Sequence, residues 1–158
     1  MFPLVVEAPL AVPLLFLAAI PAALVATFAM DLVMPRLREG KTPPQVASGV
    51  LTERSPDNAP RRLASTVHYV AGALTGPLFV WLFLVAGEFL TPGELTGAVA
   101  AVALYPLMVG FFVVVVVLPR ASGLPQRRAS VVARAWAIEA FVYVLVLAPL
   151  VTAAALFL

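Results

Sequence analysis

Four long stretches without a charged residue constrain the fold of this chain more than any other feature. They cover residues 8–30, 69–87, 95–119 and 140–158. An α-helix rises about 1.5 Å per residue, and about 20 residues cross a hydrocarbon layer about 30 Å thick. Each stretch is therefore long enough to cross a membrane. The sequence predicts an all-α polytopic membrane protein, a bundle of four transmembrane helices.

Composition supports the same class. Hydrophobic residues make up 63% of the 158 residues and the mean hydropathy is +1.05, far above the range of soluble domains. Prolines inside the stretches are expected to kink the helices without ending them, because transmembrane helices tolerate proline. We expect one transmembrane domain over residues 1–158, with spans at about 8–34, 64–88, 92–118 and 130–157.

Basic residues predict the orientation, because all ten lie in two windows, 36–62 and 120–134. Lysine and arginine beside membrane spans stay on the cytoplasmic side. Loops 35–63 and 119–129 are thus expected inside the cell and both termini outside, in the plasma membrane of a prokaryote. Nucleic acid is not an expected partner, since aromatic residues do not alternate with these arginines. The arginines expected to meet the lipid headgroups at the interface are Arg36, Arg61, Arg62, Arg120, Arg127, Arg128 and Arg134.

The longer inner loop contains "TPPQVASGVLTERSP" at residues 42–56. This pattern predicts a short helix on the membrane surface, with Thr42 as its cap. Asn58 or Asp57 is expected to cap the second span. The apolar face of the short helix is expected to consist of Val46, Val50 and Leu51.

Two pairs of similar segments suggest an internal repeat. "RRLAS" at 61–65 resembles "RRAS" at 127–130, and "LVMPRL" at 32–37 resembles "VVLPRA" at 116–121. Duplication of a two-helix unit, giving two tandem helix hairpins, explains the similarity. Basic flanks on any helix hairpin explain it equally well, so both explanations stay open.

Three ionisable residues lie within the spans at a similar depth. Asp31 precedes Arg36 by five residues, His68 follows Arg62 by six, and Glu139 follows Arg134 by five. Ionisable residues inside membranes are costly and usually face the bundle interior. We therefore predict a polar cluster of Asp31, His68 and Glu139, which either fixes the helix register or forms a proton or cation site.

Small residues predict where two helices approach closely. His68, Gly72 and Gly76 follow one another at intervals of four residues, so they share one helix face in a G-x-x-x-G pattern. The first span carries a similar stripe that ends in Asp31. The third span is mostly aliphatic and is the expected lipid-facing or partner-facing helix. The packing residues predicted on the first two spans are Gly72, Gly76, Ala23 and Thr27.

"ALVATFAMDLVMPRL" and "VHYVAGALTGPLF" resemble a family of small four-helix membrane proteins of prokaryotes, notably archaea. That family has an A-T-x-x-M segment in helix 1, here Ala26, Thr27 and Met30, and an H-[FY]-x-x-G segment in helix 2. The second segment corresponds here to His68, Tyr69 and Gly72. The family often carries a second histidine in helix 4, where this chain has Glu139. The resemblance implies a four-helix bundle and brings no agreed activity.

Function is less constrained by the sequence than the fold is. No catalytic motif is present, so we do not expect an enzyme, and we expect no cofactor and no metal site. One histidine cannot supply two axial haem ligands, and the chain has no cysteine. Two hypotheses remain. The first is an accessory or structural subunit of a larger, possibly respiratory, membrane complex, with other subunits or further copies as partners besides the lipid bilayer. The second is a small oligomeric channel or transporter in which Asp31, His68 and Glu139 line a path.

Overall fold

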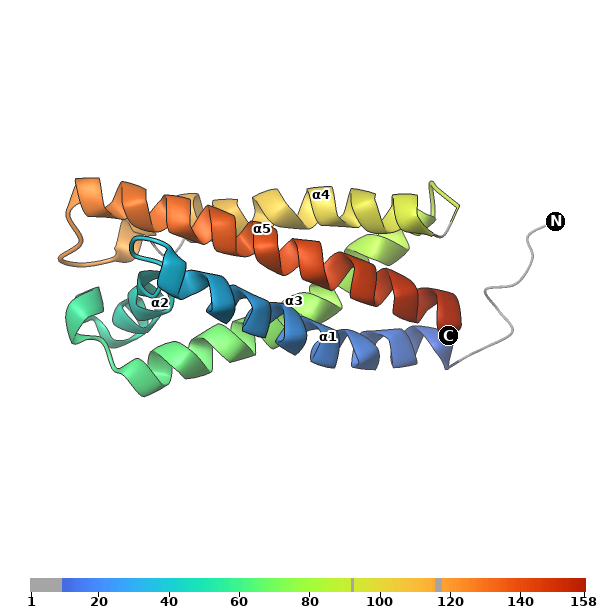
Figure 1. Ribbon diagram of the computed structural model, residues 1–158, viewed down its shortest axis with the longest axis horizontal. Helices are drawn as coiled ribbons and strands as arrows, with labels where there is room; N and C mark the ends of the chain where they lie inside the picture. The colour runs from blue at the N-terminus through green and yellow to red at the C-terminus, as the bar shows by residue number, and fades with distance from the viewer. Residues whose placement is uncertain (1–9, 92, 116–117) are drawn as a thin grey trace.

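The computed structural model describes residues 10–91, 93–115 and 118–158, and 85% of the chain is helical. Four of its helices are long and apolar enough to cross a membrane, which confirms the predicted all-α bundle (Figure 1). These helices are α1 (Ala11–Val33), α3 (Arg61–Gly87), α4 (Glu94–Gly110) and α5 (Gln126–Phe157). A short helix, α2 (Thr42–Thr52), connects α1 to α3.

The four long helices form a ring. α1 packs against α3 and α5, and α4 packs against the same two helices from the other side. The start of α1 and the end of α5 lie together at one end of the bundle, and α2 lies at the opposite end (Figure 1). We call the latter the α2 end. Both hairpins, α1 with α3 and α4 with α5, have directly packed helices.

The core differs between the two ends of the bundle. Away from the α2 end it consists of closely packed apolar side chains from all four long helices. Phe79, Leu104 and Leu147 are completely buried there. Leu15, Val80, Phe83 and Val151 complete this part of the core. Thr96 and Thr152 are buried polar side chains in this half, whereas the ionisable residues Asp31, His68 and Glu139 belong to the other half.

Prolines inside the spans do not end the helices, as predicted. Pro21, Pro77, Pro106 and Pro149 each lie inside a continuous helix. The third span is less regular than predicted, because α4 passes at Phe111–Val115 into a π-helical turn, followed by a 3-10 turn at Leu118–Arg120. Residues 92, 116 and 117 of the predicted span 92–118 lie outside the described residues.

Helix starts differ from the sequence prediction. α3 and α5 begin directly after Pro60 and Pro125, three and four residues before the predicted 64 and 130. Both prolines have extended backbone and sit at the N-cap position without a side-chain cap. The prediction that Asn58 or Asp57 caps the second span is therefore wrong. The Asn58 amide instead donates a hydrogen bond to the Ser55 hydroxyl over 2.9 Å.

α2 is not a detached helix on the surface. Its Val46 is completely buried and packs with Phe112 and Val132. The Ser48 hydroxyl donates a hydrogen bond to the carbonyl oxygen of Pro60 over 3.1 Å. Leu51 alone of the predicted apolar face is well exposed, at 65%. The predicted short helix is therefore present, and one side of it closes the end of the bundle.

Thr42 is also not the cap of α2. The helix begins at Thr42 itself, after Lys41, and Pro43 and Pro44 follow in the first turn. The Thr42 hydroxyl donates instead to the carboxylate of Glu39, three residues earlier. Prolines suit a first helical turn because its backbone N–H groups have no partner inside the helix.

α4 is the least buried of the four long helices, as its aliphatic sequence predicted. Val102 and Val114 are 75% and 71% exposed. The predicted interface arginines all belong to segments at the α2 end. One of them, Arg36, donates a hydrogen bond to the carbonyl of Leu32 in the last turn of α1.

Candidate functional site

Two of the three predicted cluster residues meet between α1 and α3. Nε2 of His68 lies 2.9 Å from Oδ1 of Asp31, and the hydroxyl of Tyr69 donates a hydrogen bond to Oδ2 of the same carboxylate. The His68 side chain is only 8% exposed, whereas that of Asp31 is 32% exposed. Tyr69 was not predicted as a site residue. The sequence signals that point to it are its position beside His68 and its place in the H-[FY]-x-x-G segment.

Close packing of small residues explains why these side chains meet. A Cβ atom added at Gly76 would lie 2.9 Å from Cβ of Ala23, and one added at Gly72 would overlap the side chain of Thr27. The predicted packing residues thus form the contact between α1 and α3. Because the two helices are antiparallel, four residues back from Gly72 on α3 and four residues forward from Thr27 on α1 bring His68 opposite Asp31.

Glu139 stands apart from this pair. Its side chain is completely buried on α5, and neither carboxyl oxygen has a hydrogen-bond partner among the described residues. A buried carboxyl group without a partner is costly, and in membrane bundles such groups often mark sites of function. Asp31 and His68 therefore form a bonded pair, and Glu139 is a separate polar element nearby.

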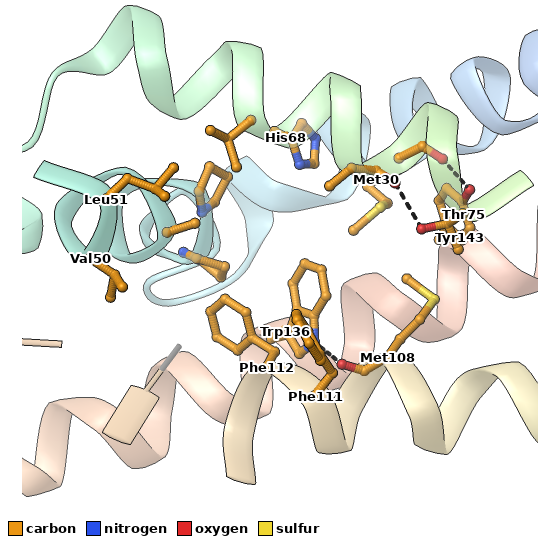
Figure 2. Close-up of a pocket in the computed structure, with 16 residues that line it drawn as sticks. Met30, Val50, Leu51, His68, Thr75, Met108, Phe111, Phe112, Trp136 and Tyr143 are labelled. Atoms are coloured by element: carbon orange, nitrogen blue, oxygen red, sulfur yellow. Dashed lines mark hydrogen bonds between the residues drawn. The ribbon is translucent and has the colours of Figure 1, made fainter. Parts of the chain in front are cut away.

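An apolar cavity of about 330 Å³ lies beside His68 at the α2 end (Figure 2). This volume is at the lower end of the range of about 300–1,000 Å³ that is typical of small-molecule sites. α2 covers one side of the cavity, and the π-helical turn after α4 supplies two phenylalanines. The walls include Met30, Val50, His68, Phe112, Trp136 and Tyr143.

Polar groups in the cavity wall bond mostly to the protein itself. The Trp136 indole N–H donates to the carbonyl oxygen of Met108 over 3.2 Å, and the Tyr143 hydroxyl donates to that of Gly72 over 2.7 Å (Figure 2). The Thr75 hydroxyl donates to the carbonyl oxygen of Ala71 over 2.8 Å. The surface left for a bound molecule is consequently apolar.

A second, polar pocket of about 600 Å³ lies on the other side of His68. His68 and Pro44 line both this pocket and the apolar cavity, so they form a shared wall. Lys41 and Arg61 contribute positive charge to the polar pocket. Its other polar wall residues are Asp31, Gln45, Ser65 and Tyr69.

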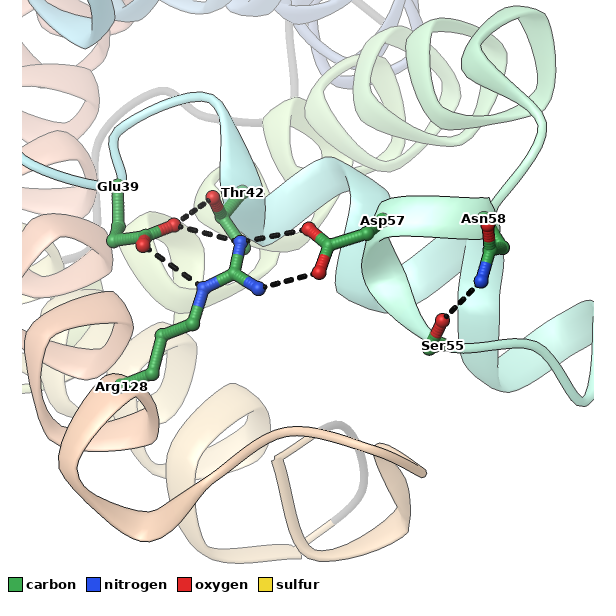
Figure 3. A network of polar contacts seen from close by, with 6 residues as sticks. All are labelled: Glu39, Thr42, Ser55, Asp57, Asn58 and Arg128. Carbon is green, nitrogen blue, oxygen red and sulfur yellow. Dashed lines mark hydrogen bonds and ion pairs between the residues drawn. The ribbon is translucent and has the colours of Figure 1, made fainter.

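Arg128 on α5 binds the two segments that flank α2 (Figure 3). Its Nε lies 2.9 Å from Oε1 of Glu39, which precedes α2, and its Nη1 lies 2.8 Å from Oδ2 of Asp57, which follows α2. A third nitrogen, Nη2, bonds to both carboxylates. These hydrogen bonds hold the pKa of Glu39 and the pKa of Asp57 below their ordinary values. Arg128 was predicted to meet lipid headgroups, but in the structure its guanidinium group binds two carboxylates of the protein.

Sequence spacing gave no sign of this network, because Arg128 is 89 residues from Glu39 and 71 from Asp57. Among the described residues, no group of three or more His, Asp and Glu side chains is arranged to hold a metal ion. The chain matches no protein-family model, and no curated protein or solved structure is significantly similar to it.

Proposed function

We propose that this protein is a non-catalytic accessory membrane protein that holds a lipid-like molecule in the apolar cavity under α2. The cavity itself carries the proposal, because its polar wall groups are largely bonded to the protein and leave an apolar surface. Water needs several polar partners to be stable in a cavity. An acyl or isoprenoid chain, by contrast, gives up no hydrogen bond when it leaves the bilayer for such walls.

The accessory role rests on two further observations. α4 and the π-helical turn after it present an aliphatic face that the other described residues leave uncovered, with Val102 and Val114 among its most exposed side chains. The sequence also carries none of the common catalytic motifs. We propose that this face contacts another membrane subunit, or a second copy of this chain, in the plasma membrane of a prokaryote. The α2 end then faces the cytoplasm, as the basic loops predict.

The transport alternative has less support. A path across the bundle needs polar groups along its whole length, and Asp31, His68 and Glu139 belong to the α2 half only. Beyond Tyr143 the core is filled by Phe79, Leu104 and their neighbours. A channel would therefore have to form between copies of the chain.

The test is to fill the cavity. Ala71 lines the cavity, and Ala98 is an alanine on α4 outside the cavity; both are exposed. Wild-type protein, Ala71→Phe and Ala98→Phe are purified in mild detergent, and bound lipids are measured by mass spectrometry. We expect one class of amphiphile at a constant molar ratio in the wild type and in Ala98→Phe, and its loss from Ala71→Phe. Equal lipid content in the two variants contradicts the proposal.

The same purification tests the accessory role. Larger subunits that co-purify at a fixed ratio support it. A homogeneous oligomer of this chain alone, whose liposomes conduct ions, favours the transport alternative instead.

A further inference from the structure

We infer that the bound molecule has an acidic headgroup of the phosphate type, which Lys41 and Arg61 bind in the polar pocket while its chain occupies the apolar cavity. This inference rests on the proposed function, since it specifies the ligand of the same site. Three observations support it: the positive charges of the polar pocket, the position of these charges at the α2 end, and the two residues that line both spaces.

The two cations are available for a ligand. Lys41 lies just before α2 and Arg61 is the first residue of α3, so different elements hold them beside one pocket. Within residues 10–91, 93–115 and 118–158, neither side chain takes part in an ion pair, whereas Arg128 binds two carboxylates. An ammonium and a guanidinium group together suit a phosphate, which accepts several charge-assisted hydrogen bonds.

Asp31 is the acidic residue of the polar pocket, and it is already engaged. Oδ1 bonds to His68, and Oδ2 accepts a hydrogen bond from Tyr69. Both oxygens of Asp31 are thus already bonded to side chains of α3. The formal charges of Lys41 and Arg61 exceed it, so the pocket favours an anion over a zwitterion that carries an ammonium group.

The order of the two spaces matches a lipid. Lys41 and Arg61 stand at helix starts at the α2 end, where the predicted headgroup layer lies. The apolar cavity extends from there toward Thr75 and Tyr143, further into the bundle. Pro44 and His68 line both spaces, which places the two spaces next to each other. The proposed lipid passes these two side chains, with its headgroup in the polar pocket and its chain in the apolar cavity.

Trp136 offers a direct readout, because it lines the apolar cavity and the chain contains only two tryptophans. The other, Trp81, is 56% exposed and is replaced in a Trp81→Phe background. Delipidated protein in detergent is titrated with phosphatidylglycerol that carries brominated chains, which quench tryptophan, and with the matching phosphatidylcholine. We expect saturable quenching of Trp136 by both lipids, at a lower concentration for phosphatidylglycerol.

Charge variants locate the headgroup. Each basic residue near anionic lipid contributes about 1 kcal/mol, which is about fivefold in affinity. Lys41→Gln/Arg61→Gln is expected to weaken phosphatidylglycerol binding about 25-fold and to leave phosphatidylcholine binding unchanged. Arg38→Gln/Arg54→Gln removes the same charge from the α2 end outside the pocket and is expected to change neither. Equal losses in the two double variants overturn the headgroup assignment.

Two further arms separate the remaining explanations. Inorganic phosphate lacks a chain, so we expect it to leave the quenching unchanged; displacement of the lipid by phosphate at similar concentrations assigns the pocket to free phosphate and overturns the lipid. Ala71→Phe is expected to abolish quenching by both lipids. If quenching persists in Ala71→Phe, the proposed function itself fails. If quenching is lost there but does not depend on Lys41 and Arg61, only the headgroup inference fails.

Discussion

His68 on α3 and Asp31 on α1 are joined by a contact of 2.9 Å between Nε2 and Oδ1, at the level where α2 closes the bundle. The side chain of His68 is only 8% exposed and lines both the apolar cavity and the polar pocket. The contact therefore lies where the interface of α1 and α3 borders both spaces. Glu139, which the sequence placed in the same cluster, has no hydrogen bond to either residue. The structure therefore predicts that His68 is energetically coupled to Asp31 and is not coupled to Glu139.

A double-mutant cycle tests it. His68→Ala and Asp31→Asn remove the two sides of one contact, so we expect a coupling free energy above about 0.5 kcal/mol in detergent unfolding experiments. His68→Ala and Glu139→Gln serve as the control cycle and are expected to be nearly additive. Stronger coupling of His68 to Glu139 than to Asp31 contradicts the arrangement described above.

The contact between α1 and α3 predicts the effect of a single methyl group. A Cβ at Gly76 would meet the backbone carbonyl of Ala19, which cannot move aside as a flexible side chain does. We expect Gly76→Ala to lower the free energy of unfolding by about 1–3 kcal/mol. Gly110→Ala is the matched control, since its added Cβ has open space around it. If the two variants unfold alike, this face of α3 does not pack as closely as described.

Loss of Arg128 should release α2. Arg128→Gln removes the partner of both Glu39 and Asp57, so the two segments beside α2 lose their common anchor. Val46→Cys provides the readout, because Val46 is completely buried and the chain has no cysteine. We expect thiol labelling at this position to become several-fold faster in Arg128→Gln. Arg127→Gln, at the exposed neighbouring position, is expected to leave the labelling rate unchanged.

The same anchor should weaken in acid. The folded-state pKa of Glu39 and that of Asp57 lie below their ordinary values of 4.5 and 3.8. Their stabilisation is therefore present above those values and is lost as pH falls through the lower folded-state values. We expect hydrogen exchange of α2, corrected for the intrinsic rate, to accelerate below about pH 4. Arg128→Gln should show no such acceleration, and an equal response in both proteins would falsify the anchor.

Orientation is tested with single cysteines. Thr91→Cys lies in the turn between α3 and α4, and Ser122→Cys lies in the turn before α5, at opposite ends of the bundle. We expect an impermeant thiol reagent to label Thr91→Cys in intact cells and Ser122→Cys only after permeabilisation. The reverse pattern inverts the predicted topology and moves the polar pocket to the outer leaflet.

The number and placement of the long helices followed from the sequence alone. Hydropathy is a property of each residue, and a stretch of about 20 apolar residues has few alternatives to a membrane helix. The contact of Gly72 and Gly76 with α1 was also predictable in part, since small residues at intervals of four mark close helix packing. Pairing of His68 with Asp31 followed from their equal depth on two such faces.

Tertiary structure alone decided the rest. Whether Glu139 joined that pair depended on the rotation and distance of α5 relative to α1, which depth along a helix does not specify. α2 packs against the bundle because Val46 is buried against Phe112 and Val132. Arg128 binds two carboxylates that are distant from it in the sequence. The apolar cavity is the space that five helices leave between them. Such a space depends on how side chains fill volume together, so the sequence of each helix determines its surfaces but not the gaps that remain when they pack.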